Sequence, residues 1–305
     1  MAYLRGTQLR PPVAPAIYTP WRRIKHIFYG WDGSVWDVTD GRDGVFLMPE
    51  GIEGMGMPII EQYTFDSPVV HGFEWEGWRA SGRDVHWVIG IFEDSSEEWI
   101  QRKKDFWRIF HPGKTLRWEV VLPTNERYSI TVRFKSDDTS VYSRDPVKLG
   151  WAIYGITGMC EQPFWEGETQ SPIWYPQSDY DFFGGTGGPP FYIASAADIT
   201  NATMSNPGDV EAFLRWELKG PFNTASVGLN GLTATVGNTS AGQTVVINTD
   251  PRNLTATRDG VDIMASLGSF EFAPLPPGED TTLSLTLDGT GSIQAFFTPL
   301  YFRSV

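Results

Sequence analysis

The acidic side chains are the residues of this chain whose type and spacing could do chemistry. Glu74 and Glu76 are two residues apart, so on a strand both side chains point to the same face. A pair of carboxylates at short range is the machinery of a glycosidase. Further acidic residues are candidates by type alone: Glu211, Glu217, Glu271, Asp179 and Asp181. Charge on a solvated strand face explains the same pattern, so we expect no catalytic residues and a protein that is not an enzyme.

We expect no metal or cofactor site either. The histidines have no metal-ligand spacing: they are His26, His71, His86 and His111. Cys160 is the one cysteine, so it has no disulfide partner. Four aspartates gather near the start, at Asp32, Asp37, Asp40 and Asp43, in a pattern that lacks the glycine and final glutamate of an EF-hand loop. Turn formation is the alternative interpretation, and the sequence leaves calcium open.

Composition excludes several classes of protein. The chain has 305 residues, of which 41% are hydrophobic and 14% aromatic, which is typical of folded domains and not of disorder. No apolar run approaches the roughly 20 residues of a membrane helix. The first residues show neither a hydrophobic stretch nor a cleavage site, so we expect no signal peptide and synthesis in a host cytoplasm. The net charge of −13 argues against binding nucleic acid.

The chain changes character around a segment rich in proline and glycine, from Cys160 to Ala194. Twelve of the 13 tryptophans lie at or before Trp174. Up to Trp165 there are 19 basic and 22 acidic residues, a net charge of −3, and from Glu166 on there are 5 and 15, a net charge of −10. We therefore predict an N-terminal domain over 1–165, a connector over 166–192 and a C-terminal domain over 193–305. The glycines at 184, 185, 187 and 188 would make the connector a flexible hinge.

The first part reads as a small β-barrel or sandwich with one inserted helix. Apolar runs at 24–29 and 35–38 around Asp32-Gly33 predict a hairpin. Glycines make 41–58 a loop, a strand follows at 57–65, and 69–78 and 83–92 look like a pair around Ser81-Gly82. Ser95 and Glu98 form a capping box for a helix that carries Trp99, Phe106, Trp107 and Phe110 and stops at His111-Pro112-Gly113. Strands resume at 115–122, 128–134 and 149–158.

The pattern of short apolar runs and turns in the second part predicts an antiparallel β-sandwich. Short strands are expected within 209–218 and at 226–229, 232–236, 244–248, 254–258, 270–272, 282–287 and 293–299. Turn signals separate them, among them Asn230-Gly231, Asp259-Gly260 and Pro277-Gly278. Many short strands at this spacing are typical of a sandwich.

Large aromatic side chains are the candidates for contacts with a partner. Such residues dominate the binding energy of protein interfaces. The candidates for subunit or partner contacts are Trp31, Trp36, Trp174, Tyr175, Phe182 and Phe183. The aromatic residues of the connector either pack between the two domains, which is the favoured interpretation, or face a partner.

The order of several motifs resembles one known family. In the C-terminal half the motifs are Asn206 with Gly208, Gly220, Gly242, Thr249-Asp250, Pro277-Gly278 and Tyr301. In the N-terminal half they are YGWDGSVWDVTD from Tyr29, GIEGMGMP from Gly51, RDVHWVIGI from Arg83, and Trp107 followed by Pro112-Gly113. In this order they resemble the distal tail proteins of siphophages, in particular Dit-like minor tail proteins of the actinobacteriophage type. The family's Asp-Thr order is reversed at Thr249-Asp250.

The resemblance implies a structural protein of the virion. Proteins of this family form a ring, commonly hexameric, at the tip of a long non-contractile tail. The resemblance implies that the N-terminal domains build the ring and that galectin-like or jelly-roll C-terminal domains lie outside it. The expected partners are tail tube protein, tape measure protein, other tail-tip or baseplate proteins and receptor-binding proteins. The alternatives are a carbohydrate-binding module or adhesin that uses the C-terminal sandwich, and a glycoside hydrolase.

Overall fold

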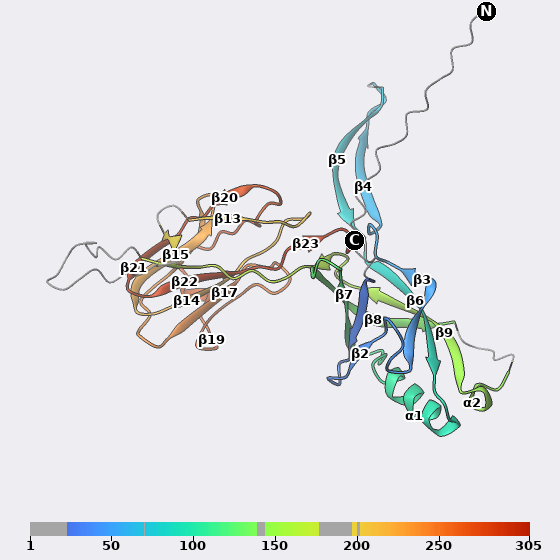
Figure 1. Ribbon diagram of the computed structural model, residues 1–305. Coiled ribbons are helices and arrows are strands. Elements are labelled where there is room, and N and C mark those ends of the chain that lie inside the picture. The colour runs from blue at the N-terminus through green and yellow to red at the C-terminus, as the bar shows by residue number, and fades with distance from the viewer. Residues whose placement is uncertain (1–22, 70, 139–143, 177–196, 200–201) are drawn as a thin grey trace, which may run out of the picture.

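The computed structural model describes residues 23–69, 71–138, 144–176, 197–199 and 202–305. It is mainly β, with two lobes side by side that each surround a hydrophobic core (Figure 1). The predicted fold class is therefore confirmed: a barrel-like first part with an inserted helix, and antiparallel sheets in the second part. No helix among the described residues is long and apolar enough to cross a membrane.

The first lobe is a strongly curved antiparallel sheet in the order β2-β1-β7-β8-β9-β6-β3. Its strands are β1 (Lys25–Tyr29), β2 (Val35–Asp37), β3 (Val45–Glu53), β6 (Arg83–Phe92), β7 (Thr115–Val121), β8 (Arg127–Asp137) and β9 (Trp151–Cys160). The predicted hairpin around Asp32-Gly33 is confirmed as β1 paired with β2. The predicted glycine loop over 41–58 is wrong, because β3 runs through it and pairs with β6 around an irregularity between Leu47 and Ile52.

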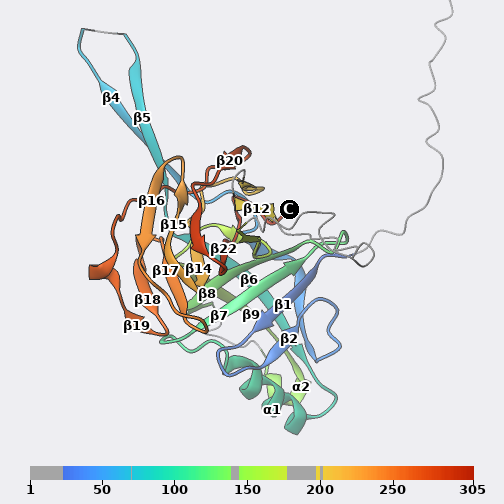
Figure 2. The same cartoon turned by 90° about the vertical axis from the view of Figure 1, so that its left-hand side faces the viewer.

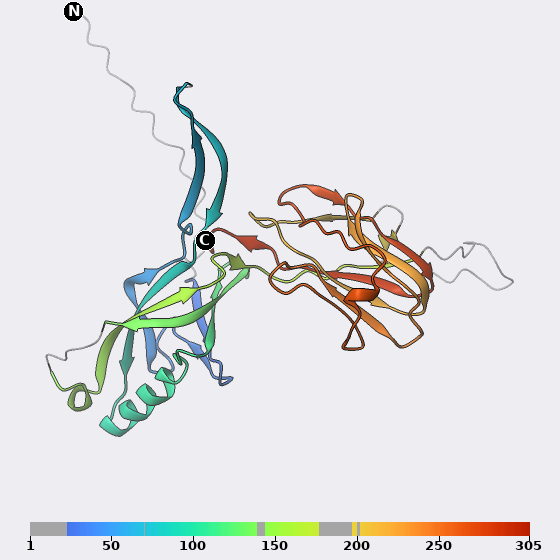
Figure 3. The same cartoon turned by 180° about the vertical axis from the view of Figure 1, so that it is seen from behind.

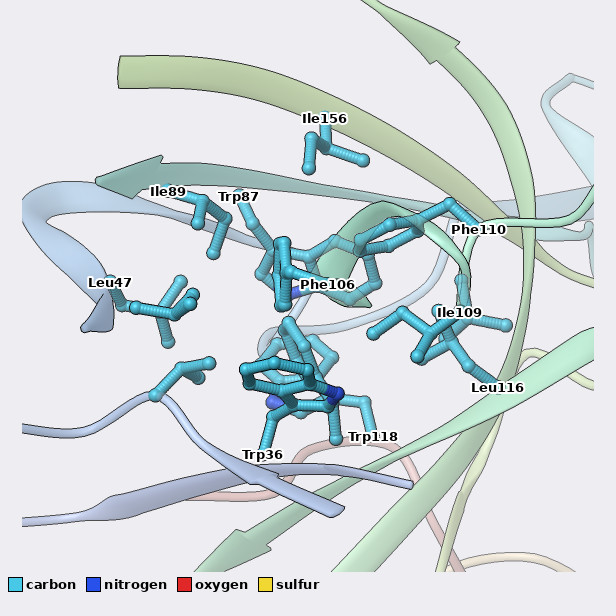
Figure 4. Packing of buried hydrophobic residues seen from close by; sticks show 14 of the residues in the cluster. Trp36, Leu47, Trp87, Ile89, Phe106, Ile109, Phe110, Leu116, Trp118 and Ile156 are labelled. Atoms are coloured by element: carbon cyan, nitrogen blue, oxygen red, sulfur yellow. The ribbon is translucent and has the colours of Figure 1, made fainter. Parts of the chain in front are cut away.

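Alternation of apolar residues on β6 and β9 builds the core of the first lobe. Val85, Trp87, Ile89 and Ile91 are at most 1% exposed, as a strand with one buried face requires. Trp87 packs edge-on against Trp118 of β7, with 5.2 Å between ring centroids, and lies 4.9 Å from the ring of Phe28 (Figure 4). These aromatic rings fill the barrel.

Helix α1 (Ser96–Trp107) closes one end of the barrel. The hydroxyl of Ser95 accepts a hydrogen bond from the backbone N–H of Glu98, so the predicted N-cap is confirmed. Trp99, Phe106 and Phe110 are buried, whereas Trp107 is only partly buried. A second, four-residue helix, α2 (Pro146–Leu149), was not predicted; Asp145 caps it and Gly150 ends it in the left-handed region.

The predicted pairing of 69–78 with 83–92 is wrong. Instead β4 (Ile60–Asp66) and β5 (Phe73–Ala80) form a hairpin of their own, paired with no other strand that the structure describes. This hairpin projects from the first lobe at the end opposite to α1 (Figures 1 and 3). The strand that follows, β6, pairs with β3 and β9 inside the barrel.

The second lobe contains the sheet β12-β11-β22-β14-β17-β18-β19 and two smaller sheets, β16-β15-β21 and β13-β20. The strands are β11 (Ile173–Tyr175), β12 (Ala197–Asp198), β13 (Thr203–Ser205), β14 (Arg215–Lys219), β15 (Phe222–Leu229), β16 (Leu232–Val236), β17 (Thr244–Asn248), β18 (Thr255–Arg258), β19 (Val261–Asp262), β20 (Asp280–Thr282), β21 (Thr286–Gly289) and β22 (Ser292–Phe296). A short 3₁₀ turn, η2, spans Met264–Ser266. Apart from the parallel pair β11–β12, the described strands pair antiparallel.

Two expectations about these strands need correction. The predicted strand at 270–272 is not one, since only Phe270 makes an isolated bridge, to Ala234. The predicted strand at 282–287 is two strands, β20 and β21, separated by residues 283–285. By contrast Asn230 and Gly231 both have positive φ, 50° and 85°, and close the tight hairpin between β15 and β16 as predicted.

The segment predicted to be a connector contains strands from both lobes. Strand β10 (Trp165–Glu166) extends the first sheet through β8, and β11 belongs to the second sheet. The predicted glycine hinge at 184–188 lies outside the described residues, but the strands before and after it, β11 and β12, pair with each other. Where one domain ends and the next begins stays a prediction.

Within the described residues, the chain crosses between the lobes twice. It first passes from β10 to β11, and it returns where β23 (Leu300–Tyr301) pairs antiparallel with β10, as Trp165 opposite Tyr301 and Glu166 opposite Leu300. Both crossings lie at the junction visible in Figure 1. Residues close to the end of this sequence therefore extend the sheet of the first lobe.

Candidate functional site

The β4–β5 hairpin projects away from the rest of the molecule (Figure 2). It exposes large aromatic side chains. The register places Trp75 opposite Thr64 and Phe73 opposite Asp66, so both aromatic rings share one face of the hairpin. Phe73 is 70% exposed and Trp75 56%, and on the other face Phe65 is 55% exposed. Isolated exposed aromatic residues are ordinary, but a cluster on a projecting element is typical of an interaction surface.

Polar contacts between its strands keep this hairpin ordered. The Trp75 indole donates to the side-chain oxygen of Gln62 at 2.7 Å. The guanidinium of Arg79 donates to Glu61 at 2.9 Å, and the Ser81 hydroxyl donates to the same carboxylate. The Ser81 hydrogen bond, followed by the charge of Arg79, lowers the pKa of Glu61. A hairpin stabilised in this way presents its rings without a core beneath them.

A second apolar surface lies on the outer face of β3, β6 and β9. Phe92 of β6 is opposite Trp151 of β9, and the two are 50% and 47% exposed. Ile153 follows on the same face and is 39% exposed. The next pairs place Phe46 of β3 over Gly90, where a side chain would collide with the Phe46 ring. We call Phe46, Phe92, Trp151 and Ile153 the outer apolar face.

The aromatic residues predicted as contacts differ in their exposure in the structure. Trp36 is 8% exposed and packs edge-on against Phe106, 5.4 Å between centroids, and Trp174 is 2% exposed beside Trp216. These two side chains belong to the cores and offer almost no surface to a second protein. Trp31 and Tyr175 are both 44% exposed, so they stay candidates. Phe182 and Phe183 lie outside the described residues.

Three of the four clustered aspartates near the start of the chain make hydrogen bonds or ion pairs with residues two positions along the chain. Asp32 accepts hydrogen bonds from the backbone and hydroxyl of Ser34, and Asp37 accepts from the backbone of Thr39. Asp40 lies 3.0 Å from the guanidinium of Arg42. Among the residues that the structure describes, no group of three acidic, histidine or cysteine side chains is placed to hold a metal ion.

A polar cleft of about 240 Å³ lies where β7, β8 and β10 meet. Its buried carboxylate, Glu119, accepts from Arg127 at 2.9 Å and from the Tyr29 hydroxyl at 3.3 Å. Glu166 lines the same cleft, and burial raises its pKa while the charges of Arg117 and Arg252 lower it. Because Glu119 already has its partners, this cleft is a structural junction rather than a prepared ligand site. Glu74 and Glu76, the pair suggested by spacing, lie exposed on β5.

The sequence analysis did not predict that the β4–β5 hairpin would present an exposed aromatic surface. The signal was present: in 73–78, FEWEGW, the aromatic residues Phe73 and Trp75 alternate with Glu74 and Glu76. Such alternation predicts a half-buried strand, and nothing in the sequence says that no core lies beneath it.

No protein-family model and no curated protein matches the chain. Among solved structures, the Dit protein of phage SPP1, described as a paradigm of the hub adsorption apparatus in phages that infect Gram-positive bacteria, matches with a TM-score of 0.61. The identity is 13%, over 90% of this chain and 98% of that one. The chain has the fold of a Dit protein.

The phage P2 baseplate in its activated conformation has the same fold in one of its chains. The structures with calcium and with strontium both match with a TM-score of 0.54 and 15% identity, over 91% of this chain and 98% of theirs. The Dit-like fold thus covers both lobes. At an identity of 13–15% the likeness shows the fold alone.

Proposed function

We propose that this protein is a structural component of a phage tail tip that assembles into a ring, with six copies as the expected number. The observation that carries the proposal is a Dit-like fold over nine-tenths of the chain together with a projecting hairpin whose aromatic rings are exposed. The solved structures with this fold are a hub protein and a baseplate, and the exposed aromatic rings of the hairpin suit a role in assembly.

The ring contact joins two different surfaces of the chain. The hairpin rings and the outer apolar face come from separate elements and lie apart, as β4–β5 projects at one end and Phe92 and Trp151 lie at the end of the sheet next to α1 and α2. Two non-overlapping surfaces on one chain suit a head-to-tail contact, which closes into a ring when its rotation allows. We therefore assign the hairpin of one copy to the outer apolar face of the next.

The second lobe is proposed to lie at the periphery and to contact other tail-tip proteins. The residues from Glu166 on have a net charge of −10, which disfavours contacts between copies of this lobe and attracts basic partners. The remaining partners of the ring would be the tail tube and tape measure proteins. A carbohydrate-binding role is less well supported, because Trp216 and Trp174 are 1% and 2% exposed and so provide no sugar platform.

The native mass and electron micrographs of the purified chain test the proposal. We expect a ring of identical subunits at micromolar concentration. A monomer that stays monomeric at the highest soluble concentration would contradict it. A glycan array probed with the full chain should show no specific saccharide, and a specific hit would support the carbohydrate-binding alternative instead.

A further inference from the structure

The angle between the β4–β5 hairpin and the barrel must be fixed by contacts at the base of the hairpin. Strands β4 and β5 pair only with each other among the described strands, so no sheet ladder attaches the hairpin sideways to the barrel. Its attachment consists of residues 54–59, which lead into β4, and of Ser81 after β5, whose N–H donates to the carbonyl of Ile59 at 2.9 Å. A two-stranded hairpin without further support is marginally stable and free to pivot.

Residues 300–304 contact the base of the hairpin from both sides. The backbone N–H of Ser304 donates to the carbonyl of Met55, on the segment before β4. The ring of Phe302 packs against Trp78 of β5, with centroids 5.7 Å apart, and against Phe164 at 5.8 Å. Within this segment Ser304 is 1% exposed, Phe302 is half-buried and Arg303 is exposed, so the segment is anchored by the buried Ser304 and by the Phe302 ring.

Arg83 connects the same segments through one buried guanidinium. It donates to the carbonyls of Pro163 and Phe302, both at 2.7 Å, and to Gly56 at 2.6 Å and Gly54. The residue is 3% exposed, and its hydrogen-bond partners are all backbone carbonyls. A rigid planar group with four such bonds fixes the relative positions of three chain segments. The loop before β4, the segment between β9 and β10 and residues 300–304 are therefore held as one unit.

The segment also reaches the second lobe. The backbone N–H of Phe302 donates to the Asp209 carboxylate at 3.0 Å, and the N–H groups of Asp209 and Val210 donate to the carbonyl of Leu300. The hairpin base is thus connected to the second lobe through a few residues. Any displacement of residues 300–304 acts on both.

We propose that residues 300–304 are a strap that fixes the angle of the β4–β5 hairpin on the barrel, with Phe302 as its positioning residue. The consequence for assembly rests on the proposed function, since it requires that the hairpin makes the ring contact. The strap then couples the second lobe to ring formation: a ring contact of correct geometry needs residues that return from the second lobe.

Hydrogen exchange of the hairpin base tests the strap directly. In Phe302→Ala we expect the Ser81 amide and the amides of β4 and β5 to exchange at least tenfold faster than in the unmodified chain, while those of β6 and β9 are unchanged. Trp78→Ala should have the same effect, and the double variant should exchange no faster than either single variant, because both remove one contact. Val305→Ala, whose side chain is 60% exposed next to the strap, is the matched control.

Unchanged exchange at the hairpin base in Phe302→Ala would overturn the proposal, as would additive effects of the two substitutions. Phe302→Leu keeps an apolar side chain and serves if the alanine variant does not fold; it should still accelerate exchange. Exchange is compared in all variants at a concentration below that at which the unmodified chain assembles, so the readout does not depend on assembly. If the unmodified chain forms no ring, the proposed function is wrong, but the exchange data still show whether residues 300–304 act as a strap. If it does form a ring, Phe302→Ala should raise the assembly concentration at least tenfold.

Discussion

The indole N–H of Trp118 donates a hydrogen bond to Nδ1 of His26 across the strand pair β1–β7, at 3.3 Å. The two rings are stacked, with 5.9 Å between centroids, and His26 is 7% exposed. Burial lowers the pKa of His26 to about 4, although the charge of Asp37 raises it in part. A protonated imidazole has a hydrogen on both nitrogens, so it could not accept this bond.

The protein should lose stability as the pH falls from 7 to 5. The pKa of His26 is lower in the folded chain than the roughly 6.5 of the unfolded chain, so the unfolded state binds more protons in this range. The stability that neutral His26 contributes is present above the unfolded pKa of about 6.5 and is lost as the pH falls towards 4. Between pH 7 and pH 5 the free energy of unfolding should therefore fall by about 2 kcal/mol. Urea unfolding at both values measures it.

The control for this pH dependence is His26→Asn. The variant should be less stable at pH 7 and should lose about 2 kcal/mol less than the unmodified chain between pH 7 and pH 5, since carboxylates that titrate in both proteins cancel. Equal pH dependence in the two proteins would contradict the role of His26.

Two neighbouring aromatic residues of α1 should differ in their contribution to stability. Phe106 is fully buried between Phe28, Trp36 and Phe110, so Phe106→Ala should cost about 3–5 kcal/mol. Trp107 is only partly buried, with its ring edge-on to Tyr154 at 5.4 Å, so Trp107→Ala should cost less. Chemical unfolding of both variants checks the order. A larger loss in Trp107→Ala would mean that this face of the helix is covered more fully than the structure shows.

The head-to-tail ring contact predicts a specific mixing result. Trp75→Lys removes the hairpin surface, and Trp151→Lys removes the outer apolar face; both side chains are about half exposed, so each variant should fold and remain monomeric. An equimolar mixture should form dimers and no rings, because one intact hairpin meets one intact face. Native mass spectrometry distinguishes the species.

Val261→Lys is the control for mixing, because Val261 is 68% exposed on the second lobe. It should assemble like the unmodified chain. Rings formed by either single variant would contradict this pairing of surfaces, and so would a mixture that stays monomeric. The ring would then have to form through another contact.

Local chemistry was enough to predict several elements. The N-cap of α1 depends on Ser95 and Glu98, three residues apart, and the turn at Asn230-Gly231 depends on two residues that tolerate positive φ. The buried face of β6 follows from the alternation of Val85, Trp87, Ile89 and Ile91. Each of these signals lies within a few residues, so no distant partner is needed to interpret it.

Distant contacts decided the rest. The alternation in 73–78 resembles that of a half-buried strand, and only the absence of a further described strand beside β5 makes its rings a surface. Trp36 and Trp174 have the residue type of interface anchors, but neighbours far along the chain bury them.

The sequence by itself determined the β class, the helix and its cap, the change of character near residue 165 and the resemblance to distal tail proteins, because these depend on composition and short-range pattern. Only the tertiary structure decided that the hairpin stands apart, that β11 and β12 pair with each other, and that Phe302 packs on Trp78. The physical reason is that strand pairing and ring packing join residues that are far apart in sequence. Their free energy depends on geometry that the rest of the chain must first establish.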